Sequence, residues 1–280
     1  MCINLLHPLT ILTCATSWIL TNLIPTTIQV ASANILVQSP KPKQTSNRKP
    51  NSGKKVQIAQ PPPGQGAPPS TPAQGRPGCP GEMLPQPLTA LVPESTIVTQ
   101  PKNNQKSQLP WGKSTQEHPT FWFYVPYSTS IHSSRFLLKN KTGKLIYQAS
   151  LPITGTPGII RVAIPPDTTP LENGKWYEAS LIVNIRCSSR TRLDNYLTAW
   201  VLREELSAPL KEQLNKQTTP LQQAIFYAEN GLWYDALAKI AELKQQNLDD
   251  GGWQSLLDSA ALGGIADKQI VSCCTPRTKQ

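Results

Sequence analysis

Two histidines are the first residues to test for chemistry, because imidazole exchanges protons near neutral pH. After residue 33 the sequence contains only His118 and His132, so a Ser-His-Asp relay would have to use one of them. No Gly-x-Ser-x-Gly, Gly-x4-Gly-Lys-Ser/Thr, His-Glu-x-x-His or Cys-x-x-Cys motif accompanies them. We therefore favour a structural, hydrogen-bonded role for both histidines, and an unrecognised hydrolase is only the second alternative for the function.

Acidic residues are the other candidates for acid-base work. Adjacent pairs such as Glu204-Glu205 and Asp249-Asp250 usually form solvated faces or favour a helix N-terminus. Asp194, close to Arg190 and Arg192, predicts an ion pair that closes a strand connection, in preference to a site for an anion or a peptide carboxylate. Because neither histidine belongs to a cluster of ligands, the sequence predicts no catalytic residue, no metal site and no cofactor.

Cysteines can form a stable disulfide if the protein is exported to an oxidising compartment. Four of them, Cys79, Cys187, Cys273 and Cys274, follow residue 33, and four cysteines allow three pairings. We expect a disulfide between Cys79 and Cys187, because Cys79 opens the foldable region and Cys187 ends a predicted strand. The adjacent Cys273 and Cys274 lie in a polar tail, where we interpret them as incidental or intermolecular.

The first 33 residues contain no Lys, Arg, Asp or Glu, and their largely apolar run leads to Ala31-Ser32-Ala33. Small residues at these positions are typical of a signal-peptide cleavage site. We expect residues 1–33 to be a signal peptide cleaved after Ala33, with an uncleaved anchor as the alternative. The protein is therefore expected to be exported to the periplasm or the cell surface.

Residues 34–78 are rich in Pro, Gln, Ser and Gly, and they hold seven of the 27 basic residues but no acidic residue. Such a segment cannot bury enough apolar surface to fold, so we expect a disordered linker. Because the rest of the chain is nearly neutral, with 20 basic against 17 acidic residues, a nucleic-acid partner is not expected. The linker is interpreted as a tether, and contact with an anionic wall or membrane surface is the alternative.

Residues 79–203 show runs of β-branched and aromatic residues separated by turn residues. These runs are residues 119–125, 135–140, 144–150, 158–164, 175–187 and 195–203, and residues 88–92 add a candidate short edge strand. Several of the runs alternate apolar and polar residues, as strands with one buried face do. The predicted fold is α+β, with an antiparallel β-sandwich of immunoglobulin-like size.

Residues 204–264 change to a helical period, which predicts helices from Pro220 to Gly231, from Trp233 to Gln246 and from Trp253 to Leu262. The middle of this region resembles one tetratricopeptide-like hairpin. Since a single repeat cannot bury its own apolar face, the hairpin should dock on the β-domain or a partner, and a helical cap is favoured over a peptide groove. Residues 265–280 are expected to form a flexible tail.

The stretch EHPTFWFYVPYST, residues 117–129, is the richest in aromatic residues. Strand alternation places Phe121 and Phe123 on one face and Trp122 and Tyr124 on the other. We expect a central strand whose outer face is covered by the C-terminal helices, because burial of a large apolar side chain stabilises by roughly 1.5–3 kcal/mol. The alternative is a glycan- or peptidoglycan-binding platform, for which the candidate residues are Trp122, Tyr124, Tyr127 and Trp176.

The ordered blocks RPGCP, PLTALVPE, HPTFWFYVPY, GTPGIIRVAIP, PLENGKWYEASLIVNIRC, AWVLRE and YAENGLWYDALAKIAEL together resemble a family of exported cyanobacterial proteins known only as a domain of unknown function. The resemblance covers roughly residues 76–262. It implies a cyanobacterial source and an exported location, and it implies no activity, cofactor or catalytic residue. The chain differs from the family pattern at its SSRTRLDNY loop and at Ala199.

The leading hypothesis is a non-enzymatic binding or assembly protein whose partner is another protein of the cell envelope. It rests on the missing catalytic motifs and on the lone helical hairpin, and the identity of the partner is not encoded in these patterns.

Overall fold

The computed structural model describes residues 83–100, 105–127, 131–154 and 156–272, together with Cys79, Gly81 and Cys274. All of them belong to the second of two compact units, residues 50–280. The predicted signal peptide, the whole predicted linker and Cys273 lie outside the described residues. The fold is α+β, as predicted. Within the described residues, no helix has the length and apolar character needed to cross a membrane.

A small antiparallel sheet has the strand order β1-β4-β7. Its strands are β1 (Thr89–Ala90), β4 (Thr120–Val125) and β7 (Gly158–Ala163). Strand β4 is central, as predicted, and it pairs with β1 on one side and β7 on the other. All three strands therefore lie where the aromatic, β-branched and LTALV segments predicted them.

A larger sheet has the strand order β2-β3-β9-β8-β5-β6. Its strands are β2 (Glu94–Gln100), β3 (Gln105–Ser114), β5 (Ile131–Asn140), β6 (Leu145–Ser150), β8 (Trp176–Arg186) and β9 (Arg192–Arg203). The last four were predicted. The tight connection between β5 and β6 contains Gly143, whose φ of +85° is available to glycine at little steric cost.

Two features of the larger sheet differ from the prediction. Strands β2 and β3 were not predicted, because their sequences, ESTIVTQ and QKSQLPWGKS, are largely polar and β3 includes Pro110. In addition, β3 pairs with β9 in parallel, with Trp111 opposite Trp200, while every other neighbouring pair is antiparallel. A wholly antiparallel arrangement is therefore wrong for this sheet.

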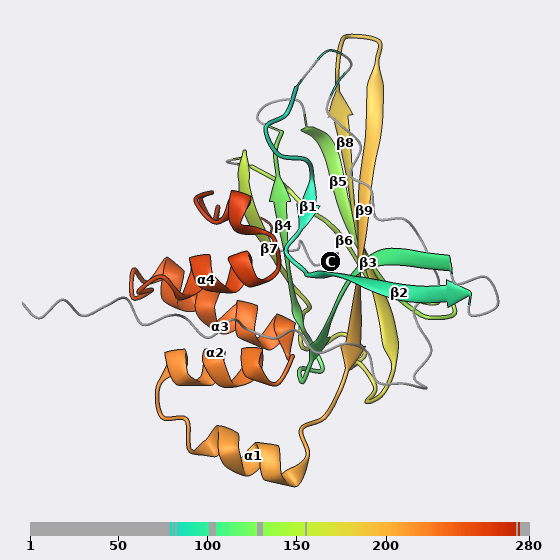
Figure 1. Cartoon of the computed structure of the whole chain (residues 1–280). Coiled ribbons are helices and arrows are strands. Elements are labelled where there is room, and N and C mark those ends of the chain that lie inside the picture. Colours follow the sequence, from blue (N-terminus) through green and yellow to red (C-terminus); the bar gives the residue numbers. More distant parts are fainter. Residues whose placement is uncertain are drawn as a thin grey trace, which may run out of the picture. The chain divides into compact units, whose positions relative to one another are not determined.

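The two sheets contact each other through aromatic side chains, and Figure 1 shows the small sheet between the helices and the larger sheet. The rings of Phe121 and Phe123 in β4 lie 5.3 and 6.1 Å from the ring of Phe136 in β5. On the opposite face of β4, Trp122 and Tyr124 are also buried. Strand β4 thus has two buried faces, as its sequence predicted.

Four α-helices follow the strands: α1 (Ala208–Asn215), α2 (Pro220–Glu229), α3 (Trp233–Gln245) and α4 (Gly252–Ser259), with a 3-10 turn at Gly263–Ile265. Helix α2 begins with a capping box between Thr219 and Gln222 and has Pro220 in its first turn. Gly231, with φ +70°, lies in the turn to α3. These boundaries agree with the predicted helix signals.

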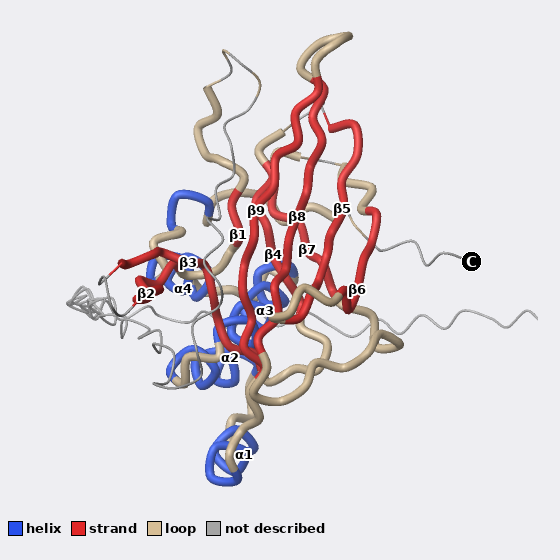
Figure 2. The backbone as a smooth tube through the Cα atoms, turned by 90° about the vertical axis from the view of Figure 1, so that its right-hand side faces the viewer, coloured by secondary structure: helices blue, strands red, loops and turns tan. Residues whose placement is uncertain are grey.

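Helix α3 docks on the sheets through its first turn. The Trp233 indole Nε1 donates a hydrogen bond of 2.8 Å to the Leu91 carbonyl, and the Tyr234 hydroxyl donates one of 3.1 Å to the Trp200 carbonyl in β9. The Tyr234 ring also lies 5.2 Å from the Phe121 ring. Figure 2, turned by 90°, shows α3 behind the strands of the larger sheet.

The chain returns to the small sheet after the last helix. The Ile159 amide in β7 donates to the Gln269 carbonyl, and the Val271 amide donates to the Ile159 carbonyl, each over 2.8 Å. Ile270 thereby forms a parallel bridge with Ile159. The prediction of a flexible tail from residue 265 is therefore wrong for residues 265–271. Ile265 of this segment is buried, and Ile270 and Val271 pack against the core.

The predicted disulfide between Cys79 and Cys187 is present and joins residues 108 positions apart. Replacement of both cysteines by Ser should lower the free energy of unfolding by about 2–4 kcal/mol, because the bond restricts the unfolded chain. Urea unfolding of the oxidised protein and of the double variant measures the difference. The explanation is wrong if reducing agent lowers the stability of the double variant as much as that of the parent.

Gly112 in β3 lies against the first turn of α3, where an added Cβ would come within 2.9 Å of the Trp233 Cβ and 3.3 Å of the Tyr234 ring. Gly112→Ala should therefore destabilise the fold by about 1–3 kcal/mol through overpacking. Gly264→Ala is the control, because its Cβ would meet only the flexible end of Gln86, at 3.0 Å. Equal melting temperatures for the two variants would contradict the close docking of α3.

Candidate functional site

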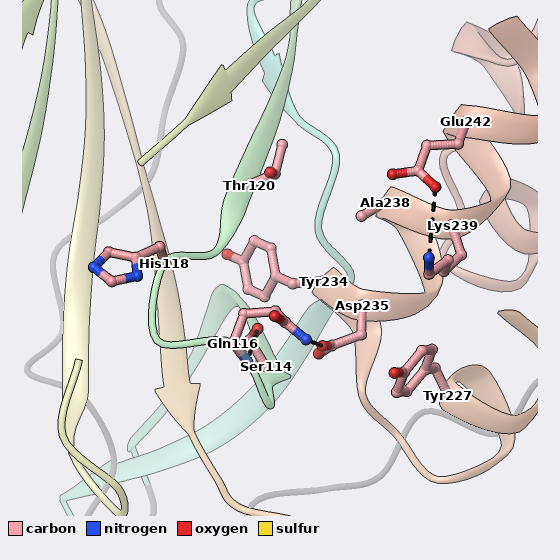
Figure 3. A pocket seen from close by; sticks show the side chains of 10 residues that line it. All are labelled: Ser114, Gln116, His118, Thr120, Tyr227, Tyr234, Asp235, Ala238, Lys239 and Glu242. Carbon is pink, nitrogen blue, oxygen red and sulfur yellow. Dashed lines mark hydrogen bonds and ion pairs between the residues drawn. The ribbon is translucent and has the colours of Figure 1, made fainter. Parts of the chain in front are cut away.

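A pocket lies where the connection from β3 to β4 meets α2 and α3 (Figure 3). Its cavity has a volume of about 230 Å³. The lining residues are Ser114, Gln116, His118, Thr120, Tyr227, Tyr234, Asp235, Ala238, Lys239 and Glu242. The pocket thus combines a serine, a histidine and an aspartate, so its geometry decides whether a catalytic relay exists.

Asp235 is the most constrained group of the pocket. It lies in the first turn of α3 and is 4 % exposed. One carboxylate oxygen accepts a hydrogen bond from the Thr115 amide, at 2.9 Å. The other oxygen accepts from the Thr115 hydroxyl, at 2.7 Å, and from Gln116 Nε2, at 3.1 Å. The carboxylate therefore attaches the β3–β4 connection to α3.

Burial raises the pKa of Asp235, because the charged form loses its hydration. The hydrogen bonds from Thr115 and Gln116 act in the opposite direction and only partly offset this effect. The pKa of Tyr227, across the pocket, is raised first by burial and then by the nearby charge of Asp235. Both groups are thus held in their protonated forms to higher pH than in water.

His118 does not complete a relay with Asp235. Its Nε2 lies 2.9 Å from the Thr168 carbonyl, to which it donates, and Figure 3 shows its ring apart from the Asp235 carboxylate. The Ser114 hydroxyl accepts a hydrogen bond from the Gln116 amide at 3.1 Å. The serine and the aspartate are therefore both bonded to Gln116, whereas the histidine is bonded to a backbone carbonyl and lies outside this network.

The other histidine lies elsewhere. His132 is exposed near the start of β5, and its Nδ1 is 3.3 Å from the Arg186 guanidinium. Among the described residues, no group of three or more His, Cys, Asp or Glu side chains could hold a metal ion. Lys239 and Glu242, whose charged groups lie 3.6 Å apart, also line the pocket.

The four aromatic residues of the alternative platform do not form a common surface. Trp122, Tyr124, Tyr127 and Trp176 are between 1 and 4 % exposed. Trp176 belongs to a separate cluster with Trp111, Trp200 and Leu202, and its ring lies 5.5 Å from that of Trp111. A glycan could not reach the faces of Trp122 and Tyr124 unless the elements that cover them moved.

Charged residues singled out in the sequence have varied roles. Asp194 accepts a hydrogen bond of 2.7 Å from Asn184, and the predicted ion pair with Arg190 or Arg192 is not among the salt bridges of the described residues. Both arginines are exposed, so water competes with such a pair. Asp249 accepts from the Trp253 amide at 3.0 Å, as expected at a helix N-terminus.

The importance of Asp235 was missed from sequence. An acidic residue in the first helical turn is a common favourable feature of helices, and WYDAL gives no sign that the carboxylate is buried. Its partners Thr115 and Gln116 are 120 and 119 residues distant. Only the juxtaposition of β3 and α3, which the sequence did not predict, brings the three residues together.

Asp235→Asn should lower the free energy of unfolding by about 1–3 kcal/mol, because an amide has one acceptor oxygen and would leave one buried donor unpaired. Since the pKa of Asp235 is raised in the folded protein, its contribution to stability is largest at acidic pH and declines as pH rises through the folded pKa. The deficit of the variant should therefore shrink with rising pH in that range. Urea unfolding at several pH values measures it.

Asp258→Asn is the control, because Asp258 is exposed and accepts from Gln254 on its own helix. A deficit of the Asp235→Asn variant that stays constant with pH, or that matches this control, would contradict the role assigned to the buried carboxylate.

Comparison with known proteins agrees with the resemblance to a domain of unknown function. The family model described as Domain of Unknown Function (DUF928) matches residues 72–270. No curated protein and no solved structure matches the chain. The matched range includes all the strands and helices described above, and the pocket with them. The chain belongs to the family Domain of Unknown Function (DUF928).

Proposed function

We propose that the protein is an exported, non-enzymatic binding or assembly protein of the periplasm or cell surface, and that its helical region docks a protein of the cell envelope. The main observation in support of this proposal is the exposure of apolar side chains on the outward face of α2. Leu221 and Ile225, one turn apart, are 37 and 49 % exposed, whereas Ala224 and Phe226 of the same helix are buried. Apolar side chains at this spacing are typical of helix faces that contact a partner.

Helix α1 extends this argument. It has no fully buried residue, and Leu210 and Leu214, again one turn apart, are only partly buried against the core. Figure 1 shows α1 beyond α2, at the end of the helical region that is farther from the sheets. A helix that contributes so little to the core is available for contact with another protein.

Two finer structural interpretations belong to this proposal. The pairing of α2 with α3, with Gly231 in the turn, supports a tetratricopeptide-like hairpin that lacks neighbouring repeats. The face-to-face packing of the two sheets supports a β-sandwich of immunoglobulin-like size. In both interpretations the β-part is a rigid base that presents the helices.

The disulfide supports export, because disulfides persist in oxidising compartments. A basic tether at residues 34–78 would keep the folded part near an anionic wall or membrane surface. The hydrolase alternative is weaker, because His118 is hydrogen-bonded to a backbone carbonyl instead of a nucleophile. The platform alternative is weaker because its aromatic rings are buried.

Site-specific photocrosslinking tests the proposal. A photoreactive amino acid in place of Ile225 should give a discrete crosslinked product in the cell envelope, because this side chain is 49 % exposed on the proposed docking face. Tyr196 is the matched control, since it is 47 % exposed on the larger sheet. The Ile225 product should disappear when Leu221 is changed to Glu. The same product from both positions, or none from Ile225, would contradict the proposal.

A further inference from the structure

Strand β6 forms one margin of the larger sheet (Figure 2). It pairs with β5 on one side, and among the described residues no backbone hydrogen bond reaches its other side. The corresponding edge of β7 is covered by residues 269–271. The open edge of β6 is therefore a place where the larger sheet can accept a further strand.

The register of β5 with β6 shows which backbone groups face this edge. The Leu151 amide donates to the Ser134 carbonyl at 3.0 Å. Hydrogen-bonded and non-hydrogen-bonded pairs alternate along an antiparallel ladder, which assigns Ala149 to the bonded set and Gln148 and Ser150 to the other. The N–H and C=O groups of Gln148 and Ser150 therefore point away from β5, toward the open edge.

The sequence of β6 does not block pairing with another strand. LIYQAS contains no proline and no charged residue, which are common protections of an edge strand. Leu145 is 47 % exposed, and Gln148 and Ser150 are exposed as well. Because a row of outward N–H and C=O groups is matched by another extended backbone, the edge favours a strand over a helix or a small molecule.

The charge of the β5–β6 hairpin indicates which strand fits. Residues 131–154, which include both strands and their connection, contain no acidic residue. Their four basic residues are Arg135, Lys139, Lys141 and Lys144. A partner segment with acidic side chains would therefore complement this margin of the sheet.

Acidic residues of other segments leave two of these cations without a partner. The acidic residues near the hairpin are Glu178, which is opposite Lys139, Glu172, which lines a recess with Lys141, and Asp167, whose charge acts on the Tyr147 hydroxyl. Neither Arg135 nor Lys144 is among the salt bridges of the described residues. The cross-strand neighbours of Arg135 are Ser150 and Ile182, which carry no charge. One cation toward each end of β6 is thus available to a partner.

A recess lies beside the open edge at the end of β6. It has a volume of about 300 Å³, and its lining residues are Ser133, Ser134, Arg135, Ser150, Leu151 and Pro152. Arg135 and Ser150 are both exposed. An acidic side chain of an added strand can enter this recess and accept a charge-assisted hydrogen bond from the Arg135 guanidinium.

We propose that β6 accepts an extended acidic segment of a partner protein as an additional strand. The segment pairs with the outward groups of Gln148 and Ser150, and its acidic residues lie beside Arg135 and Lys144. Pairing between two copies of β6 is disfavoured, because it would bring the basic hairpins of both copies together.

This surface goes beyond the docking face proposed on α2 and shares no residue with it. Crosslinking from Ile225 and strand addition at β6 can therefore fail separately.

The test is titration of the ¹⁵N-labelled, disulfide-bonded full chain with the peptide acetyl-ETVTVE-amide, followed by NMR. The amides of Gln148 and Ser150 should shift. Their hydrogen exchange should slow by about tenfold or more at saturation, because the added strand would bind groups that face solvent in the free protein. The control peptide acetyl-KTVTVK-amide has the same central sequence and the opposite charge, and it should bind about tenfold more weakly.

Variants of the protein separate backbone pairing from charge. Gln148→Pro should keep the fold, because the amide that it removes is not bonded to β5, and it should abolish binding of the acidic peptide. Gln148→Thr, which keeps this amide, is the matched control. Arg135→Gln should weaken binding by about fivefold, whereas Arg190→Gln, at an exposed position in the β8–β9 turn, should not.

The proposal is wrong if the acidic peptide gives no saturable shift, if the basic peptide binds as tightly, or if exchange at Gln148 and Ser150 is not slowed. It is also wrong if Arg135→Gln binds like Arg190→Gln, or if a folded Gln148→Pro variant binds like Gln148→Thr. Sedimentation that shows a dimer of the chain, lost on Gln148→Pro, would assign the edge to a second copy and would overturn the proposal as well.

Discussion

The first turn of α3 is the contact on which the rest of the fold depends. Three consecutive side chains of this turn form hydrogen bonds to three separate segments. Trp233 donates to the carbonyl of Leu91, Tyr234 donates to the carbonyl of Trp200, and Asp235 accepts from the connection after β3. Each bond is buried or partly buried, so each donor or acceptor left without its partner would cost about 1–3 kcal/mol. The helices and both sheets are therefore joined at one place, and a disturbance there affects all of them.

This arrangement also gives the molecule two kinds of surface. The side of the helices toward the sheets is committed to the core, with Ala236, Leu237 and Ala241 fully buried. The outward side of α2 keeps two exposed apolar residues, Leu221 and Ile225, that the core does not use. Since one helical hairpin cannot bury both of its sides, the β-part covers the side that faces the sheets.

Local sequence signals predicted much of the fold. Thr219, Pro220 and Gly231 mark helix ends by backbone chemistry that depends on few neighbours. The two-faced apolar pattern of residues 119–125 predicted a central strand, and the places of Cys79 and Cys187 at the ends of predicted elements indicated the pairing that the structure shows. The features that the sequence did not predict depend on contacts between distant parts of the chain. They are the polar strands β2 and β3 and the parallel pairing of β3 with β9. The candidate site was missed for the same reason, because Asp235 acquires its role only through hydrogen-bond partners more than 100 residues away in the sequence.

The return of residues 269–271 to the edge of β7 has a consequence for solubility. Strand β7 is mostly apolar and pairs with β4 along only one side, and unprotected strand edges of this kind recruit strands from other molecules. The Ile159–Ile270 bridge covers that edge with the protein's own chain. Val271 also lies so close to Gly158 that a side chain there would meet it at 2.7 Å. Residues 269–271 therefore protect the molecule against edge-to-edge aggregation, and this protection is in place only after the whole folded region has been synthesised.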